Sequence, residues 1–134
     1  MTAVDTNVVV RILTADDQDQ TAASRALFAA GPIWIAKTVL LETGWVLRSA
    51  FGLKEPQVCA AIRSLLGLEN VVAEDEEAVE AALDLSAHGM GFADAIHLAS
   101  RPPGAEFATF DETFSRRAKK AGARGIRDLS IRTR

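Results

Sequence analysis

Two aspartates directly follow short apolar runs that are typical of β-strands. Asp5 follows Ala3 and Val4, and Asp111 follows the run that ends at Phe110. Ligands of open parallel α/β sheets collect beyond the carboxyl ends of the strands. We therefore expect both carboxylates at the same edge of the sheet, if the strands are parallel. Asp is also a favoured helix N-cap, and for either residue alone the two interpretations are equally well supported.

Glu42 is a carboxylate within an otherwise apolar helical segment. Its neighbours at i−3, i+3 and i+4 are Val39, Trp45 and Val46, so the helical period predicts that Glu42 points into their apolar stripe. A capping box that begins at Thr38 would need the acid three residues later, at position 41, which is a leucine. No Lys or Arg lies three or four residues from Glu42 in the sequence. An ionised Glu is almost never fully buried without a partner. These observations favour a functional role for Glu42.

Asp94 is a fourth candidate, either as a helix N-cap or as a functional carboxylate. Together with Asp5, Glu42 and Asp111 it would form a strongly repulsive group at one edge of a sheet. A hard divalent cation such as Mg²⁺ resolves this repulsion, because it prefers oxygen ligands and combines carboxylates with substrate phosphate. A second cation assembled with substrate would permit two-metal hydrolysis of a phosphodiester bond.

The other residue types that bind metals offer no competing site. His88 and His97 do not have the spacing of a zinc-binding helix, and His97 lies one helical turn after Asp94, where we expect it to pack or to support the carboxylates. Cys59 is the only cysteine, which excludes a disulfide framework and any multi-cysteine metal site. Its apolar neighbours predict a core position.

Short strand-like runs alternate with helical segments along the chain. The expected strands are 3–4, 33–35, 71–72, 107–110 and an edge strand beginning at Ile126. The expected helices are 8–13, 16–30, 38–51, 55–67, 75–88, 92–100 and 111–121. This alternation predicts a central, mainly parallel sheet in a three-layer α/β/α domain. The length of 134 residues, with no linker or repeat, predicts one domain over 1–134.

The composition is that of an ordinary soluble globular protein, with 49% hydrophobic and 25% charged residues. We expect a cytoplasmic protein with no membrane partner, because the sequence shows neither a signal peptide nor a membrane-spanning apolar run. The net charge of −3 provides no overall attraction to nucleic acid.

The charge is distributed unevenly. Residues 69–94 contain eight acids and no Lys or Arg, whereas residues 101–134 contain nine bases and four acids. The acidic block 74–77 is best explained as the first turn of a helix, where carboxylates complement the helix dipole.

Four segments of the chain form an ordered set: 5–11 (DTNVVVR), 39–48 (VLLETGWVLR), 92–99 (FADAIHLA) and 108–111 (ATFD). In this order they resemble the motifs of PIN-domain ribonucleases, and specifically of the VapC toxins of bacterial type II toxin–antitoxin pairs. No single segment is diagnostic, but the ordered set is specific and covers essentially the whole chain.

The resemblance implies a PIN-like fold and a Mg²⁺- or Mn²⁺-dependent endoribonuclease. Matched by position, the acidic quartet is Asp5, Glu42, Asp94 and Asp111. Asn7 would orient Asp5 or a water molecule on the metal, and the hydroxyls of Thr6 and Thr109 would support the site. Gly91 departs from the pattern, because many relatives carry an acid at that position.

The resemblance also implies partners. We expect a homodimer that is silenced by a VapB-type antitoxin, whose C-terminal segment would cover the active site. Operator DNA would be reached only through the antitoxin complex. Trp45 and Phe51 are expected in the core or in the dimer interface.

Arg116 and Lys120 lie on one helix face at i, i+4 spacing and could hold RNA phosphates beside the metal. The simpler explanation, which we favour, is that they complement the C-terminus of their helix.

Two other functions remain open. A phosphohydrolase of the haloacid-dehalogenase type would use Asp5 as nucleophile, but it normally needs an aspartate at position 7, which is Asn7 here, and the expected lysine is not evident. A non-catalytic module would use its acidic edge to bind a metal or the basic tail of a partner.

Overall fold

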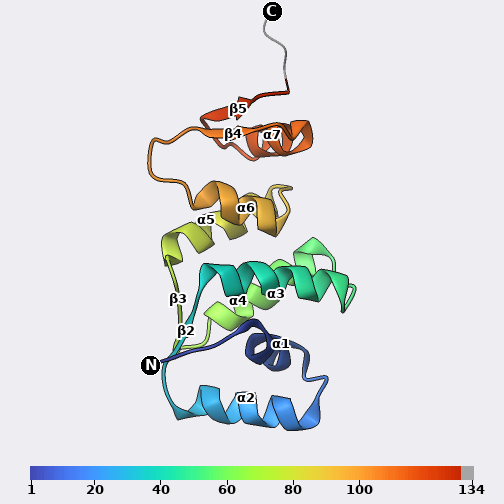
Figure 1. Ribbon diagram of the computed structural model, residues 1–134, viewed down its shortest axis with the longest axis vertical. Helices are drawn as coiled ribbons and strands as arrows, with labels where there is room; N and C mark the ends of the chain where they lie inside the picture. Colours follow the sequence, from blue (N-terminus) through green and yellow to red (C-terminus); the bar gives the residue numbers. More distant parts are fainter. Residues whose placement is uncertain (131–134) are drawn as a thin grey trace, which may run out of the picture.

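The computed structural model describes residues 1–130 (Figure 1). The helices are α1 (Thr6–Thr14), α2 (Gln18–Ala30), α3 (Lys37–Ser49), α4 (Glu55–Leu66), α5 (Glu76–Ala87), α6 (Phe92–Ala99) and α7 (Glu112–Lys120). The strands are β1 (Thr2–Ala3), β2 (Ile33–Ile35), β3 (Val71–Ala73), β4 (Phe107–Thr109) and β5 (Ile126–Asp128). Each predicted strand and helix is present, and most boundaries agree to within two residues. The last part of the basic C-terminal segment, residues 131–134, lies outside the described residues.

All the strand pairs are parallel. The first sheet has the order β1-β2-β3, with Thr2 opposite Ile33 and Ile33 opposite Val71. In the second sheet β4 lies beside β5, and Phe107 is opposite Ile126. The predicted α/β fold with parallel strands is therefore confirmed. The strands form two sheets, however, and not a single continuous one.

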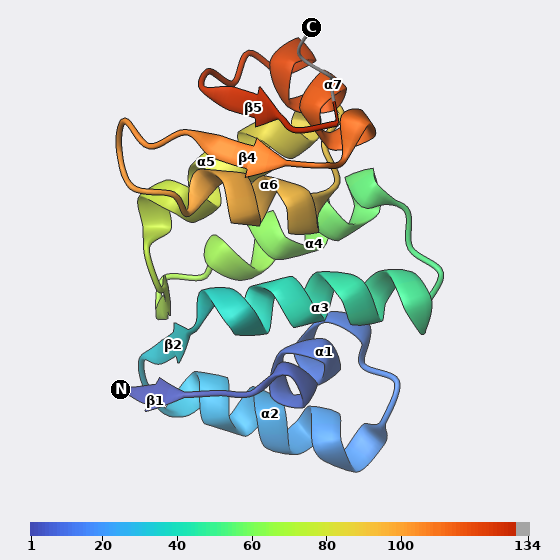
Figure 2. The ribbon, with the colours of Figure 1, turned by 45° about the horizontal axis from the view of Figure 1, so that its top comes forward.

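The helices separate the two sheets along the long axis of the molecule. α1 and α2 lie at one end, α7 lies with β4 and β5 at the other, and α3 to α6 lie between them (Figures 1 and 2). α3 packs against α1, α4 and α6, and α5 packs against α4 and α6. Because these helices lie between β1 and β4, the two strands cannot share one sheet in this arrangement.

Aspartate caps begin four of the helices, and the capping interpretation given for Asp5 and Asp111 is confirmed. Their side chains accept hydrogen bonds from the backbone N–H three residues later: Asp5 from Val8, Asp17 from Gln20, Asp75 from Ala78 and Asp111 from Phe114. The acidic block forms the start of α5, because Asp75 is the cap and Glu76 and Glu77 lie in the first turn. That prediction is confirmed.

The core joins α3, α4 and α6 to the first sheet. Ile33 and Ile35 of β2 are buried, as are Leu40 and Leu47 of α3. α3 approaches α6 closely at Gly44, where a Cβ atom would stand 3.2 Å from Cδ2 of Phe92. Glycine is therefore the residue that permits this helix contact.

Cys59 lies at the margin of this core, half-buried and packed against it. Its Sγ atom is 3.2 Å from Oγ of Ser86. Phe51 is also half-buried against the core. None of the helices between residues 1 and 130 combines the length and apolar character needed to cross a bilayer.

Candidate functional site

Glu42 is solvent-exposed on α3 and is not buried in an apolar stripe, so the predicted burial of Glu42 is wrong. Its carboxylate accepts a hydrogen bond from the hydroxyl of Thr6 at the start of α1. The stripe exists, but it lies at the surface: Val39 and Val46 are half-buried and Trp45 is 67% exposed. The core position considered for Trp45 is therefore excluded. Helical periodicity identifies the residues that share a face, whereas packing decides whether that face is covered.

Asp5 lies beside this contact, because it immediately precedes Thr6. It is exposed and caps α1 by accepting a hydrogen bond from Val8 N at 3.3 Å. Asp5 and Asn7 also line a shallow groove between α1 and α2, together with Arg11. Capping and a functional role are compatible here, since the cap occupies one carboxylate oxygen.

Asp94 is half-buried in the first turn of α6. The residue at the N-cap of this helix is Gly91, so the interpretation of Asp94 as an N-cap is wrong. Burial raises the pKa of Asp94 above its ordinary value, and the negative charge of Asp111 raises it further. Asp94 and Asp111 are therefore close enough to interact, although they come from different helices.

Asp111 is exposed at the N-cap of α7, two residues after Thr109, which ends β4. Its Oδ1 atom accepts a hydrogen bond from Phe114 N at 3.0 Å. The backbone N–H of Asp111 donates to Oγ1 of Thr109 at 2.9 Å. Thr6 and Thr109, the two threonines that the resemblance implied, thus each contact a candidate acid. Thr6 contacts the side chain of Glu42, and Thr109 contacts the backbone N–H of Asp111.

Three further charged residues act on Asp94. His97 and Arg117 lower the pKa of Asp94 electrostatically, and Glu55 raises it. We expect His97 to pack or to support the carboxylates, and it is exposed on α6. Glu55 and Arg117 are not among the predicted site residues. The sequence offered little signal for either, because Glu55 opens α4 like an ordinary first-turn acid and Arg117 is one of several bases in α7.

The two basic residues that were predicted, Arg116 and Lys120, are exposed on α7. Lys120 lies in the last helical turn, where a cation complements the helix dipole. Of the α7 bases, it is Arg117 whose charge lowers the pKa of Asp94.

The structure thus relates the four carboxylates in two pairs. Asp5 and Glu42 are linked through Thr6, and Asp94 interacts with Asp111. Asp5 and Asp111 follow strands of different sheets, so the expected single sheet edge is not formed. Within residues 1–130, no three acidic, histidine or cysteine side chains are placed closely enough to hold one metal ion.

The chemistry of the Asp94–Asp111 pair nevertheless suits a divalent cation. Mg²⁺ commonly uses only one or two protein carboxylates and completes its coordination with water and substrate phosphate. A cation would also relieve the repulsion that raises the pKa of Asp94. The residues present therefore fit Mg²⁺ or Mn²⁺.

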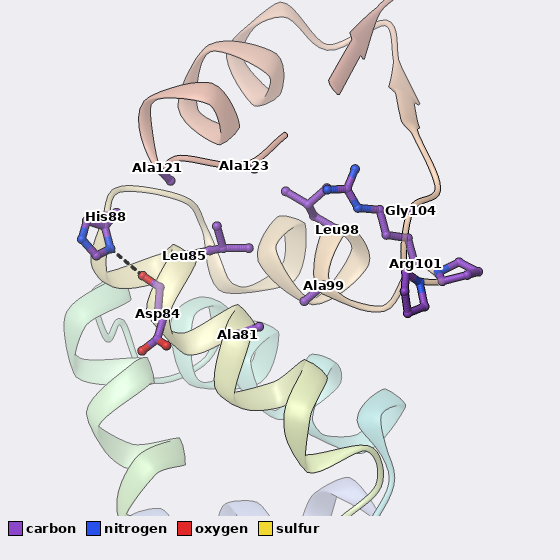
Figure 3. A pocket seen from close by; sticks show the side chains of 12 residues that line it. Ala81, Asp84, Leu85, His88, Leu98, Ala99, Arg101, Gly104, Ala121 and Ala123 are labelled. Atoms are coloured by element: carbon purple, nitrogen blue, oxygen red, sulfur yellow. Dashed lines mark hydrogen bonds between the residues drawn. The ribbon is translucent and has the colours of Figure 1, made fainter. Parts of the chain in front are cut away.

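A cavity of about 510 Å³ lies elsewhere, between α5, α6 and the turn after α7 (Figure 3). His88 lies at its wall, with Nδ1 2.8 Å from the backbone oxygen of Asp84, and Leu85 and Leu98 give it an apolar lining. None of the four predicted carboxylates lines this cavity. The candidate carboxylates therefore lie outside this cavity: Asp5, Glu42 and Asp111 are exposed and Asp94 is half-buried.

Comparison with known proteins bears on most of the chain. The model of the family described as "PIN domain" matches residues 2–120. Among curated proteins, none matches the sequence. The matched residues include all four carboxylates and span β1 to α7. The chain therefore belongs to the PIN domain family, whose members are generally nucleases that depend on a divalent metal.

Proposed function

We propose that this protein is a Mg²⁺- or Mn²⁺-dependent endoribonuclease and the toxin of a type II toxin–antitoxin pair. The acids that carry the activity are Asp5, Glu42, Asp94 and Asp111. Family membership supports the nuclease class. The observation that carries the proposal is the half-buried position of Asp94 in the first turn of α6, where burial and the negative charge of Asp111, the N-cap of α7, raise its pKa.

A divalent cation held by Asp94 and Asp111, and a second one held by Asp5 and Glu42 together with substrate, would neutralise these carboxylates and stabilise negative charge on a phosphodiester. The chain's own residues hold the acids in place. The hydroxyl of Thr6 donates a hydrogen bond to the carboxylate of Glu42. The hydroxyl of Thr109 accepts a hydrogen bond from the backbone N–H of Asp111. Asn7 is exposed beside Asp5 and is available to orient it.

RNA would be held by phosphate contacts close to the acids. Arg117 is the best placed base, because its charge acts on Asp94, and Arg116 and Lys120 extend the basic surface of α7. Such a local surface explains how a chain with a net charge of −3 can act on RNA. The proposal also includes a cytoplasmic homodimer that is silenced by a VapB-type antitoxin, with operator DNA bound only through that complex.

The decisive experiment compares RNA cleavage by the purified chain and by matched Asp→Asn variants. Structured RNA is incubated with Mg²⁺, with Mn²⁺ or with EDTA. Asn is as good an N-cap as Asp, so Asp111→Asn removes the charge and keeps the start of α7. Asp17→Asn is the control, because Asp17 caps α2 in the same way and belongs to neither carboxylate pair.

We expect cleavage by the wild type and by Asp17→Asn, and at least about a hundredfold loss in Asp94→Asn and Asp111→Asn, a typical loss when a catalytic group is removed. Equal cleavage by all four proteins would show a contaminating nuclease and contradict the proposal. Mn²⁺ binding without any cleavage would favour the non-catalytic module. An aspartyl-phosphate trapped on Asp5 would favour the phosphohydrolase.

The toxin role has its own test in cells. Induced expression of the wild type should arrest growth, and sequencing of RNA 5′ ends should reveal new cleavage sites. Expression of Asp94→Asn should produce neither effect. Growth arrest that is equal for the two proteins would contradict an arrest caused by RNA cleavage.

A further inference from the structure

Glu55 lies where three helices meet, although its place in the sequence marks it only as the first residue of α4. One oxygen of its carboxylate, Oε2, accepts a hydrogen bond from the backbone N–H of Phe92 at 3.2 Å. The other oxygen, Oε1, lies 2.9 Å from Nη1 of Arg48 near the end of α3. A single carboxylate therefore contacts both α3 and α6 while it belongs to α4.

The start of α6 requires such a partner. The first N–H groups of a helix have no acceptor within the helix, and a side chain at the N-cap normally supplies one. The N-cap of α6 is Gly91, which has no side chain to offer. Glu55 supplies the acceptor from another helix, and its negative charge is favourable at the positive end of the α6 dipole.

Gly91 also lies against this carboxylate. A Cβ atom placed on Gly91 would lie 3.5 Å from Oε1 of Glu55, which is van der Waals contact. The space where a side chain at position 91 would begin is thus bordered by the carboxylate of Glu55. In this chain the carboxylate that accepts a hydrogen bond from the first N–H group of α6 comes from α4.

This contact lies next to a candidate acid. Asp94 is in the same first turn of α6 as Phe92, and Glu42 is on α3, the helix that carries Arg48. The Arg48–Glu55–Phe92 contacts therefore fix the helix that bears Asp94 relative to the helix that bears Glu42. Residues that hold metal ligands in place commonly change metal affinity about 10- to 100-fold when they are removed.

We propose that Glu55 is a positioning residue, which anchors the first turn of α6 to α3 and so sets the position of Asp94 for cation binding. This inference rests on the proposed function, because it gives Asp94 the role of a metal ligand. Glu55 itself is not a catalytic residue.

Two variants of Glu55 separate its contacts. Glu55→Ala removes both the hydrogen bond and the ion pair. Glu55→Gln keeps an oxygen that can accept from Phe92 N but loses the charge that pairs with Arg48. The matched control is Glu80→Ala, which removes a carboxylate that is 67% exposed and lies 4.0 Å from Arg63. It makes the same change in net charge away from the site.

The first measurement does not involve a metal. Amide hydrogen exchange over residues 92–94 is followed in the metal-free proteins. We expect exchange to be about tenfold faster in Glu55→Ala, because the first turn frays without its acceptor. It should be close to the wild-type rate in Glu55→Gln and Glu80→Ala. An unchanged exchange rate in Glu55→Ala overturns the anchoring role, independently of the Mn²⁺ affinity of that variant.

The second measurement is calorimetric titration with Mn²⁺ alone. We expect Glu55→Ala to bind about tenfold more weakly than the wild type, Glu55→Gln to recover most of the loss, and Glu80→Ala to be unchanged. RNA cleavage should lose kcat in Glu55→Ala, with little change in KM. Wild-type Mn²⁺ affinity in Glu55→Ala, with binding lost in Asp94→Asn, overturns this inference alone. Wild-type affinity in Asp94→Asn overturns the metal site of the proposed function as well.

Discussion

Gly44 of α3 and Phe92 of α6 form the contact between the two helices that bear Glu42 and Asp94. A Cβ atom at Gly44 would stand 3.2 Å from Cδ2 of the Phe92 ring, and the ring is only 2% exposed. Glu42 lies two residues before Gly44 in the sequence, and Asp94 lies two residues after Phe92. The spacing between the helix that bears Glu42 and the helix that bears Asp94 therefore depends on the absence of a side chain at position 44.

Gly44→Ala tests this contact. Alanine favours a helix over glycine by about 1 kcal/mol, but its methyl group would press on a buried ring, and overpacking a core costs about 1–3 kcal/mol. We expect a net decrease of about 1 kcal/mol in the free energy of unfolding, measured by urea denaturation. The control is Gly31→Ala, where a Cβ atom would meet nothing within 4 Å and stability should barely change. A stabilised Gly44→Ala would contradict the close packing.

Asp94→Asn should stabilise the metal-free protein near neutral pH while it abolishes cleavage. The pKa of Asp94 is raised in the folded state by burial and by Asp111, from an ordinary value of 3.8. The folded state therefore disfavours the ionised form, and this penalty grows as the pH rises through the raised pKa. Below pH 3.8 both states are protonated and the penalty disappears. Thermal unfolding with EDTA should show a higher Tm for the variant at pH 7.5, and a smaller difference at pH 4.5.

Asp75→Asn provides a control of opposite sign. Hydrogen bonding from Lys37 lowers the pKa of Asp75, so its ionised form stabilises the fold above the ordinary value of 3.8. That stabilisation is lost as the pH falls through the lowered pKa. The variant should therefore be less stable than the wild type at pH 7.5 and approach it in acid. A destabilised Asp94→Asn at pH 7.5 would contradict the electrostatic description of the site.

The hydrogen bond between Thr6 and Glu42 can be measured by a double-mutant cycle. Thr6→Val removes the hydroxyl at nearly constant volume, and Glu42→Ala removes the acceptor. We expect a coupling free energy of about 1 kcal/mol, the usual net value of one hydrogen bond. A coupling near zero in urea denaturation would show that the two helices are not joined by this contact in solution.

Asp111 has a structural and a proposed chemical role, and two substitutions separate them. Asp111→Ala removes the cap of α7 and should cost about 1 kcal/mol of stability, whereas Asp111→Asn should cost little. Both should lose RNA cleavage, because neither has a carboxylate. Denaturation and cleavage assays on the same preparations check this. Activity retained in Asp111→Asn would assign Asp111 to capping alone.

The local elements follow from the sequence because their signals are local. Asp17 and Asp75 begin their helices with hydrogen bonds to residues only three positions away, so each cap can be recognised from a short window of sequence. The strand 33–35 is predicted with its observed bounds, since an apolar run between Pro32 and the next helix leaves few alternatives. The four candidate acids were likewise found from residue type, context and the ordered motifs.

The sequence by itself determined the succession of parallel strands and helices, the starts of the helices, and the four candidate acids, two of which, Asp5 and Asp111, also cap helices. Only the tertiary structure decided that β1 and β4 lie in different sheets, that the stripe around Glu42 faces solvent, and that Glu55 caps α6. The physical reason is the range of the interactions. A cap joins residues three apart, whereas Glu55 and Phe92 are 37 residues apart and Thr6 and Glu42 are 36 apart, so those contacts exist only after the helices have packed.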